Sequence, residues 1–143
     1  MTIPLSFVNP GSCVGLRPAP GNPGGLRVGM DMVSVHDVQA SIDEFGQRFV
    51  SRLFSAAEQA DSIAVPARQA ERLAARFAAK EAAIKAFDLS AAGVSWREFE
   101  VRCDSRGACR LHLHGRAAAL AGVREAALSL SHRRDHAVAV VLV

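Results

Sequence analysis

The sequence predicts an α+β fold in which a mostly antiparallel sheet packs against a long helix. Helical periodicity dominates the first part of the chain, and alternating strand patterns that group into two hairpins follow it. The 143 residues are enough for one domain with a single core, and too few for two. Half of the residues are hydrophobic and 22% are charged, which is typical of a globular protein.

The N-terminal segment, residues 1–25, is rich in glycine and proline and can sustain neither a helix nor a central strand. We therefore expect a flexible arm there and a folded domain over residues 26–143. No apolar stretch reaches the roughly 18 residues of a membrane span, so no membrane association is expected. The three cysteines, Cys13, Cys103 and Cys109, lack a CxxC motif, which argues against a disulfide framework or a zinc site and favours a reduced, cytoplasmic setting.

In the first part of the domain, residues 26–35 read as an apolar strand interrupted by one acid. Apolar residues recur every three or four positions over residues 38–54, which predicts an amphipathic helix. Ser55 and Glu58 form a capping-box motif that starts a short helix. A long helix follows over residues 66–87, and it begins with a proline, as first turns often do.

The second part of the domain reads as two hairpins separated by one short helix. The expected elements are strands over residues 93–104 and 109–115, a helix over residues 115–122, and strands over residues 125–132 and 136–143. The last strand is nearly all apolar, so it should lie centrally in the sheet.

Charged residues interrupt the apolar patterns of the first strand and the long helix. Asp31 lies among valines and methionines, Lys80 falls inside the apolar arc of the helix, and Glu81 and Lys85 line the flank of that arc. A buried carboxylate needs a cation or donors, and two carboxylates from different elements are a common way to hold Mg²⁺. Simpler interpretations stay open: a surface Glu81–Lys85 pair, a backbone cap by Asp31, and a lysine head that extends to solvent.

The cations of the long helix suit a diphosphate. Arg76, Lys80 and Lys85 interleave with Glu81, and no glycine-rich phosphate loop is present in the sequence, so side chains and a metal would have to bind the phosphates. Ser131 and His132, at the end of a strand, offer further donors, although a polar strand end before a turn is an equally simple interpretation.

Five motifs resemble those of a known family in their order and approximate spacing. They are GMDMVSV at residues 29–35, FSAAE at 54–58, RFAAKEAAIKAF at 76–87, WREFEV at 96–101 and SLSH at 129–132. The chain resembles holo-(acyl carrier protein) synthases, the short bacterial branch of the 4′-phosphopantetheinyl transferases, over residues 27–143. The resemblance implies the 4′-phosphopantetheinyl transferase fold and a homotrimer with active sites at subunit boundaries.

The resemblance also implies a reaction. Such an enzyme moves 4′-phosphopantetheine from coenzyme A to a serine of an acyl carrier protein and releases adenosine 3′,5′-bisphosphate. By analogy with the family, Asp31 and Glu81 would bind Mg²⁺, and Asp31, Glu81 and Lys85 would be the catalytic residues. The residues expected to bind coenzyme A are Arg76, Lys80, Lys85, Ser131 and His132.

The expected protein partner is an acidic acyl carrier protein in fatty acid biosynthesis. Arg48 and Arg52 match basic positions that the family uses for docking. Three departures bear on the partner and the coenzyme A rim: Asp37 stands where many members have arginine, DLSAAG replaces a Gly-Thr-Gly, and Cys109 replaces the proline of a Gly-x-Pro turn. Two alternatives stay open, a sister transferase that serves polyketide or peptide carriers and a non-catalytic basic module. No nucleic acid partner is expected, since the chain has no tyrosine and no run of strand aromatics for base stacking.

Overall fold

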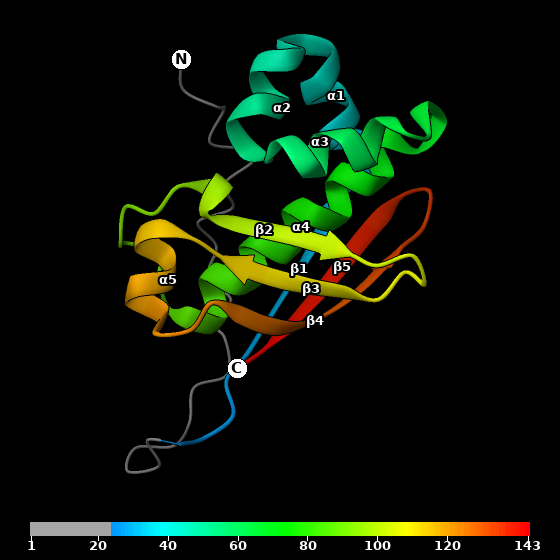
Figure 1. Ribbon diagram of the computed structural model, residues 1–143. Helices are drawn as coiled ribbons and strands as arrows, with labels where there is room; N and C mark the ends of the chain where they lie inside the picture. Colours follow the sequence, from blue (N-terminus) through cyan, green and yellow to red (C-terminus); the bar gives the residue numbers. More distant parts are fainter. Residues whose placement is uncertain (1–23) are drawn as a thin grey trace.

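The structure is a computed structural model that describes residues 24–143 (Figure 1). Its helices and strands are β1 (Val28–Ser34), α1 (Val35–Phe45), α2 (Gln47–Leu53), α3 (Ala56–Ile63), α4 (Gln69–Phe87), β2 (Phe99–Cys103), β3 (Cys109–Leu113), α5 (Gly115–Ala121), β4 (Glu125–His132) and β5 (His136–Leu142). Short 3-10 turns at Pro66–Arg68 and Trp96–Glu98 precede α4 and β2. The expected N-terminal arm lies outside the described residues, apart from its last two.

The five strands form one antiparallel sheet in the order β1-β5-β4-β3-β2. The long helix α4 packs across one face of this sheet, and α1, α2 and α3 gather at one end of the molecule (Figure 1). The α+β class, the two hairpins and the internal position of the last strand are as the sequence predicts. The helix expected over residues 38–54 is instead two helices, because Gly46 adopts a positive φ of 57° and ends α1.

The interface between α4 and the sheet is built from small residues. Alanines at eight positions of α4 are buried, and Ala137 and Ala139 face them from β5. Gly29 on β1 is required by this close approach, because a Cβ at that position would lie 1.9 Å from the carbonyl oxygen of Ala82. The backbones of β1 and α4 are therefore nearly in contact, and polar groups on either element are held in a fixed relation.

The opposite face of β1 and β5 is apolar and open. Strand alternation places Met30 and Met32 on this face, and they are 60% and 64% exposed. Val138 and Val140 of β5 pair with these methionines in the ladder and lie on the same face. No helix within residues 24–143 combines the length and the apolar character that a membrane crossing requires.

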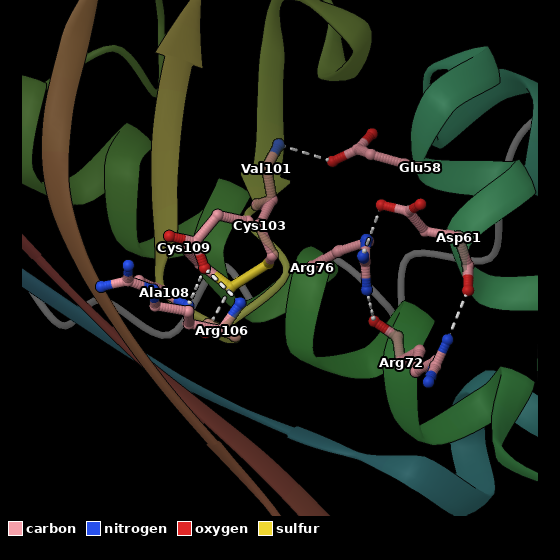
Figure 2. Close-up of a disulfide and its surroundings, with 11 residues drawn as sticks. Glu58, Asp61, Arg72, Arg76, Val101, Cys103, Arg106, Ala108 and Cys109 are labelled. Carbon is pink, nitrogen blue, oxygen red and sulfur yellow. Dashed lines mark hydrogen bonds and ion pairs between the residues drawn. A yellow bond between two sulfur atoms is a disulfide. The ribbon is translucent and has the colours of Figure 1, made fainter.

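Cys103 and Cys109 form a disulfide across the β2–β3 hairpin (Figure 2). The expectation that the chain lacks disulfides was therefore wrong. The two residues lie directly opposite each other in the antiparallel ladder, with their Cα atoms 4.0 Å apart. Sequence separation alone did not indicate the pair, whereas the register of the hairpin does.

Candidate active site

Asp31 and Lys85 form an ion pair between β1 and α4. Asp31 shares the inward face of β1 with Gly29 and Val33, because side chains alternate along a strand. Its Oδ1 lies 2.5 Å from the Lys85 Nζ, and Lys85 also donates to the carbonyl oxygen of Met30 at 3.3 Å. Both side chains are only about one-fifth exposed. The close packing at Gly29 thus places a carboxylate of the sheet against the last turns of the helix.

Glu81 lies one helical turn before Lys85 and belongs to the same cluster. Burial and the negative charge of Asp31 raise the pKa of Glu81, Lys85 opposes both effects, and the net result is a pKa of about 7. Its Oε1 is buried and has no hydrogen-bond partner within the described part of the chain. Two neighbouring carboxylates therefore lie near a single ammonium group. When both carboxylates are ionised, the cluster carries more negative than positive charge.

A divalent cation fits this cluster. Oxygen ligands from two carboxylates suit Mg²⁺, which usually keeps several water or substrate ligands. Within residues 24–143 no group of three or more potential protein ligands is present. Asp31 and Glu81 would therefore supply the protein ligands, with the remaining positions open to water and phosphate oxygens.

Arg76 lies further toward the N-terminus of α4, nine positions before Lys85. Its side chain is only 8% exposed, and the guanidinium contacts the Asp61 carboxylate at 3.3 Å and donates to the Arg72 carbonyl oxygen at 3.2 Å (Figure 2). Its Nε has no partner among the described residues. This arginine is held in place by α3 and α4 and keeps one donor unused.

The structure gives Lys80 a different role from the expected contact with coenzyme A. Both Lys80 and Glu58 are completely buried, and the Lys80 Nζ lies 2.9 Å from the Glu58 Oε2. Lys80 also donates to the carbonyl oxygens of Trp96 and Phe99, while the Glu58 Oε1 accepts from the Val101 N–H at 2.9 Å. Burial lowers the pKa of Lys80, and the charge of Glu58 opposes this shift. Lys80 therefore ties α3, α4 and β2 together, and we withdraw it from the coenzyme A ligands.

Sequence reasoning assigned Glu58 to a capping box alone. The capping box is present, since Ser55 and Glu58 exchange both hydrogen bonds. The same carboxylate also receives the Lys80 ammonium. The signal that could have found this pair is a lysine inside an apolar helical arc, because such a residue needs a buried acid elsewhere.

Ser131 and His132 lie on opposite faces of the sheet. The Nδ1 of His132 is 3.2 Å from the Glu71 Oε2 in the first turn of α4. Ser131 pairs with Val138 in the ladder and shares the outer, apolar face with it. Within one chain, only His132 of the two lies on the α4 side with Arg76.

Arg48 and Arg52 are exposed on α2. They are four residues apart, so they share one side of the helix. Helix α2 lies with α1 and α3 at one end of the molecule (Figure 1). Two exposed arginines on one helical face form a basic surface suited to an acidic partner.

Comparison with known proteins identifies the family of this chain. Residues 27–141 match the model of the 4′-phosphopantetheinyl transferase superfamily. A holo-[acyl-carrier-protein] synthase of Koribacter versatilis is 43% identical over 125 residues, covering 82% of this chain and 96% of the relative. The holo-[acyl-carrier-protein] synthase of Herpetosiphon aurantiacus is 38% identical over 130 residues, covering 82% of this chain and 97% of the relative.

Solved structures give the same result. The structure of a Chronobacterium ammoniagenes ACPS-CoA complex superposes with a TM-score of 0.72 at 33% identity, covering 82% of this chain and 96% of the other. The Mycobacterium tuberculosis acyl carrier protein synthase superposes with a TM-score of 0.63 at 34% identity, covering 80% and 93%. On the family match, the sequence identity and the shared fold, this chain belongs to the 4′-phosphopantetheinyl transferase superfamily, in its holo-[acyl-carrier-protein] synthase branch.

Proposed function

We propose that this protein transfers 4′-phosphopantetheine from coenzyme A to a serine of an acyl carrier protein, with Mg²⁺, and releases adenosine 3′,5′-bisphosphate. The observation that carries the proposal is the Asp31, Glu81 and Lys85 cluster, in which a buried carboxylate oxygen lacks a partner among residues 24–143. The relatives named as holo-[acyl-carrier-protein] synthases and the coenzyme A complex of the C. ammoniagenes protein support the same reaction.

Asp31 and Glu81 would hold the metal, which neutralises the charge of a bound diphosphate. Lys85 lies beside both carboxylates, where its ammonium can bind a phosphate oxygen and stabilise charge on the leaving group. Arg76 and His132 lie toward the other end of α4. Nine helical positions span about 13 Å, so this arrangement suits an extended nucleotide with phosphates at both ends.

Arg48 and Arg52 would attract the acidic surface of the carrier protein. Charge attraction of this kind accelerates encounter and weakens with salt. Reversal of both charges should raise the KM for the carrier, with a smaller effect on the KM for coenzyme A. An unchanged carrier KM would assign docking to another surface.

A second and third copy of this chain would cover the open apolar face of β1 and β5. The exposed Met30 and Met32, with the neighbouring valines, form a continuous apolar surface of the kind that subunit interfaces bury. Ser131, on that same face, would then lie at a subunit boundary. Light scattering on the purified protein measures the assembly directly, and a monomer would contradict this part of the proposal.

The reaction is tested by intact mass of an apo carrier protein after incubation with the enzyme. The carrier should gain the mass of one phosphopantetheine group only when both coenzyme A and Mg²⁺ are present. Asp31→Asn and Glu81→Gln should abolish the gain. Glu125→Gln, which changes an exposed carboxylate of β4, is the matched control and should retain it.

A panel of apo carriers from fatty acid, polyketide and peptide synthesis identifies the preferred partner. Modification of polyketide or peptide carriers alone would favour the sister-transferase alternative. Carrier binding that does not depend on coenzyme A, with no mass gain on any carrier, would favour a non-catalytic module.

A further inference from the structure

The cystine of the β2–β3 hairpin lies where the buried part of the hairpin ends. Val101 and Leu111 form the preceding inward-facing pair and are 1% and 0% exposed. The next inward pair is Cys103 and Cys109, of which Cys103 is exposed and Cys109 partly buried against the core. A small thiol in solution can therefore reach the disulfide without unfolding the domain.

Apart from the disulfide, hydrogen bonds within the hairpin hold its far end. Glu58 binds the Val101 N–H, and this is the last hydrogen bond from β2 to the interior within residues 24–143. Beyond it, Asp104 stabilises the turn by accepting from the N–H groups of Arg106 and Ala108 at 2.8 and 3.0 Å. Two backbone hydrogen bonds also cross the turn, from the Asp104 N–H to the Ala108 carbonyl oxygen at 2.9 Å and from the Gly107 N–H to the Asp104 carbonyl oxygen at 3.0 Å. The turn residues are exposed, and the disulfide adds a covalent link to these hydrogen bonds.

Residues of α4 lie in the surroundings of the cystine. Arg72 and Arg76 are among the residues that surround the cystine in Figure 2. Arg76 keeps a buried Nε without a partner among the described residues, and the proposed function assigns this arginine to the nucleotide phosphates. A change in the order of the hairpin would therefore alter the surroundings of this proposed phosphate ligand.

We propose that Cys103 and Cys109 form a reversible disulfide–dithiol couple that adjusts the coenzyme A end of the site. This inference rests on the proposed function for its effect on coenzyme A, and on the hairpin alone for the thiol chemistry. In the oxidised state the S–S bond joins the ends of β2 and β3, and in the reduced state these two strand ends are free to separate.

The chemistry balances as a thiol–disulfide exchange with a low-molecular-weight thiol. A thiolate attacks one cysteine sulfur and forms a mixed disulfide with it, the cystine S–S bond breaks, and the other cysteine leaves as a thiolate. A second thiol then attacks the mixed disulfide and releases the first cysteine. The cystine takes up two electrons and two protons overall, and the small thiol leaves as its own disulfide.

The couple is tested by thiol alkylation and intact mass on the native, full-length protein. After equilibration in buffers of reduced and oxidised dithiothreitol, the protein should pass from one alkylated cysteine, Cys13, to three. Cys13→Ser is the matched control and should shift both end points by one without moving the midpoint. A disulfide that resists excess dithiothreitol until the protein is denatured would overturn the proposal, and so would three free thiols under oxidising conditions.

The effect on the site is tested by transfer kinetics in the two redox states. Reduction should raise the KM for coenzyme A by about three- to tenfold with little change in kcat, because the end of the β2–β3 hairpin must then be ordered when the nucleotide binds. A variant that combines Cys103→Ala and Cys109→Ala should show the reduced value in either buffer. Since the wild-type comparison needs no substitution, misfolding of that variant leaves the test intact. An equal KM in both states would overturn the effect on the site.

Failure of the transferase assignment is distinguishable from failure of this inference. If no carrier gains mass in either redox state, the proposed function fails. Amide hydrogen exchange over residues 102–110 then decides the remainder. Faster exchange after reduction supports the proposal that the disulfide orders the hairpin end, and unchanged exchange overturns it.

Discussion

Glu81 provides a quantitative test of the carboxylate cluster without any assay of transfer. Burial and the charge of Asp31 raise its pKa from the usual 4.5 to about 7, although the charge of Lys85 opposes this rise. A carboxyl whose folded-state pKa is raised favours folding when protonated. Its contribution to the free energy of unfolding is therefore present below its unfolded-state pKa and is lost as the pH rises through about 7.

The size of this effect follows from the shift. At about 1.4 kcal/mol per pKa unit, the rise from 4.5 to about 7 corresponds to a loss of roughly 3 kcal/mol in the free energy of unfolding for a fully buried carboxyl. The partial solvent access of the Glu81 carboxylate reduces this loss to about 1–2 kcal/mol. Glu81→Gln removes the titrating group and keeps the side-chain shape. In the absence of divalent cations, the variant should therefore gain stability relative to wild type as the pH rises, by about that amount.

Urea unfolding at about pH 5 and about pH 8, with a chelator present, measures the difference. Glu125→Gln is the matched control, and its stability should follow that of wild type at both pH values. Addition of Mg²⁺ at the higher pH should stabilise the wild type and leave Glu81→Gln nearly unchanged, because binding to the folded state alone stabilises it. Parallel pH dependences of wild type and Glu81→Gln would refute the reasoning.

Three further predictions concern the framework of the site. Lys80→Met leaves the buried Glu58 carboxylate without its cation and should cost about 3–5 kcal/mol in urea unfolding; adding Glu58→Gln to this variant should recover part of the loss, and equal losses would contradict the pairing. Gly29→Ala must push β1 away from the Ala82 carbonyl oxygen, so both thermal stability and Mg²⁺ affinity by calorimetry should fall; retention of both would contradict this packing. Met32→Lys places a charge on the open face and should yield a folded monomer by circular dichroism and light scattering, whereas an unchanged assembly would exclude this face as the interface.

Local patterns were sufficient to predict much of the fold. The period of the long helix, the alternation of the strands and the capping box at Ser55 each depend on neighbouring residues, and the structure contains all three. The same alternation places Asp31 on the side of β1 that faces α4. The sequence thus predicted that Asp31 and Glu81 require compensating charge, and the structure brings them close enough for one to raise the pKa of the other.

Contacts between distant positions were beyond such reasoning. Glu58 and Lys80 are separated by 22 residues and meet only because α3 packs beside α4. The helical wheel correctly identified Lys80 as misplaced for a surface residue, but it carries no information on which acid lies opposite. A helical wheel is equally compatible with a diphosphate and with a buried carboxylate as the partner of Lys80. Only the tertiary packing distinguishes these two partners.

The cystine is an intermediate case. Cys103 and Cys109 flank a predicted turn, and pairing the strands on either side of this turn places them opposite each other. The absence of a CxxC motif was treated as evidence against a disulfide, although a hairpin can join cysteines at a wider spacing. Assigning the register before the cysteine chemistry would have found the bond.

The buried pair of Glu58 and Lys80 has a consequence for how molecules of this protein meet one another. Strand β2 is the last strand on its side of the sheet, where unpaired backbone groups would normally attract a strand from a neighbouring chain. The Val101 N–H already donates to the Glu58 carboxylate, and the Phe99 carbonyl oxygen already accepts from the Lys80 ammonium. These two backbone groups of the edge strand are therefore not available to a strand of a neighbouring chain, which disfavours strand addition along this side of the sheet.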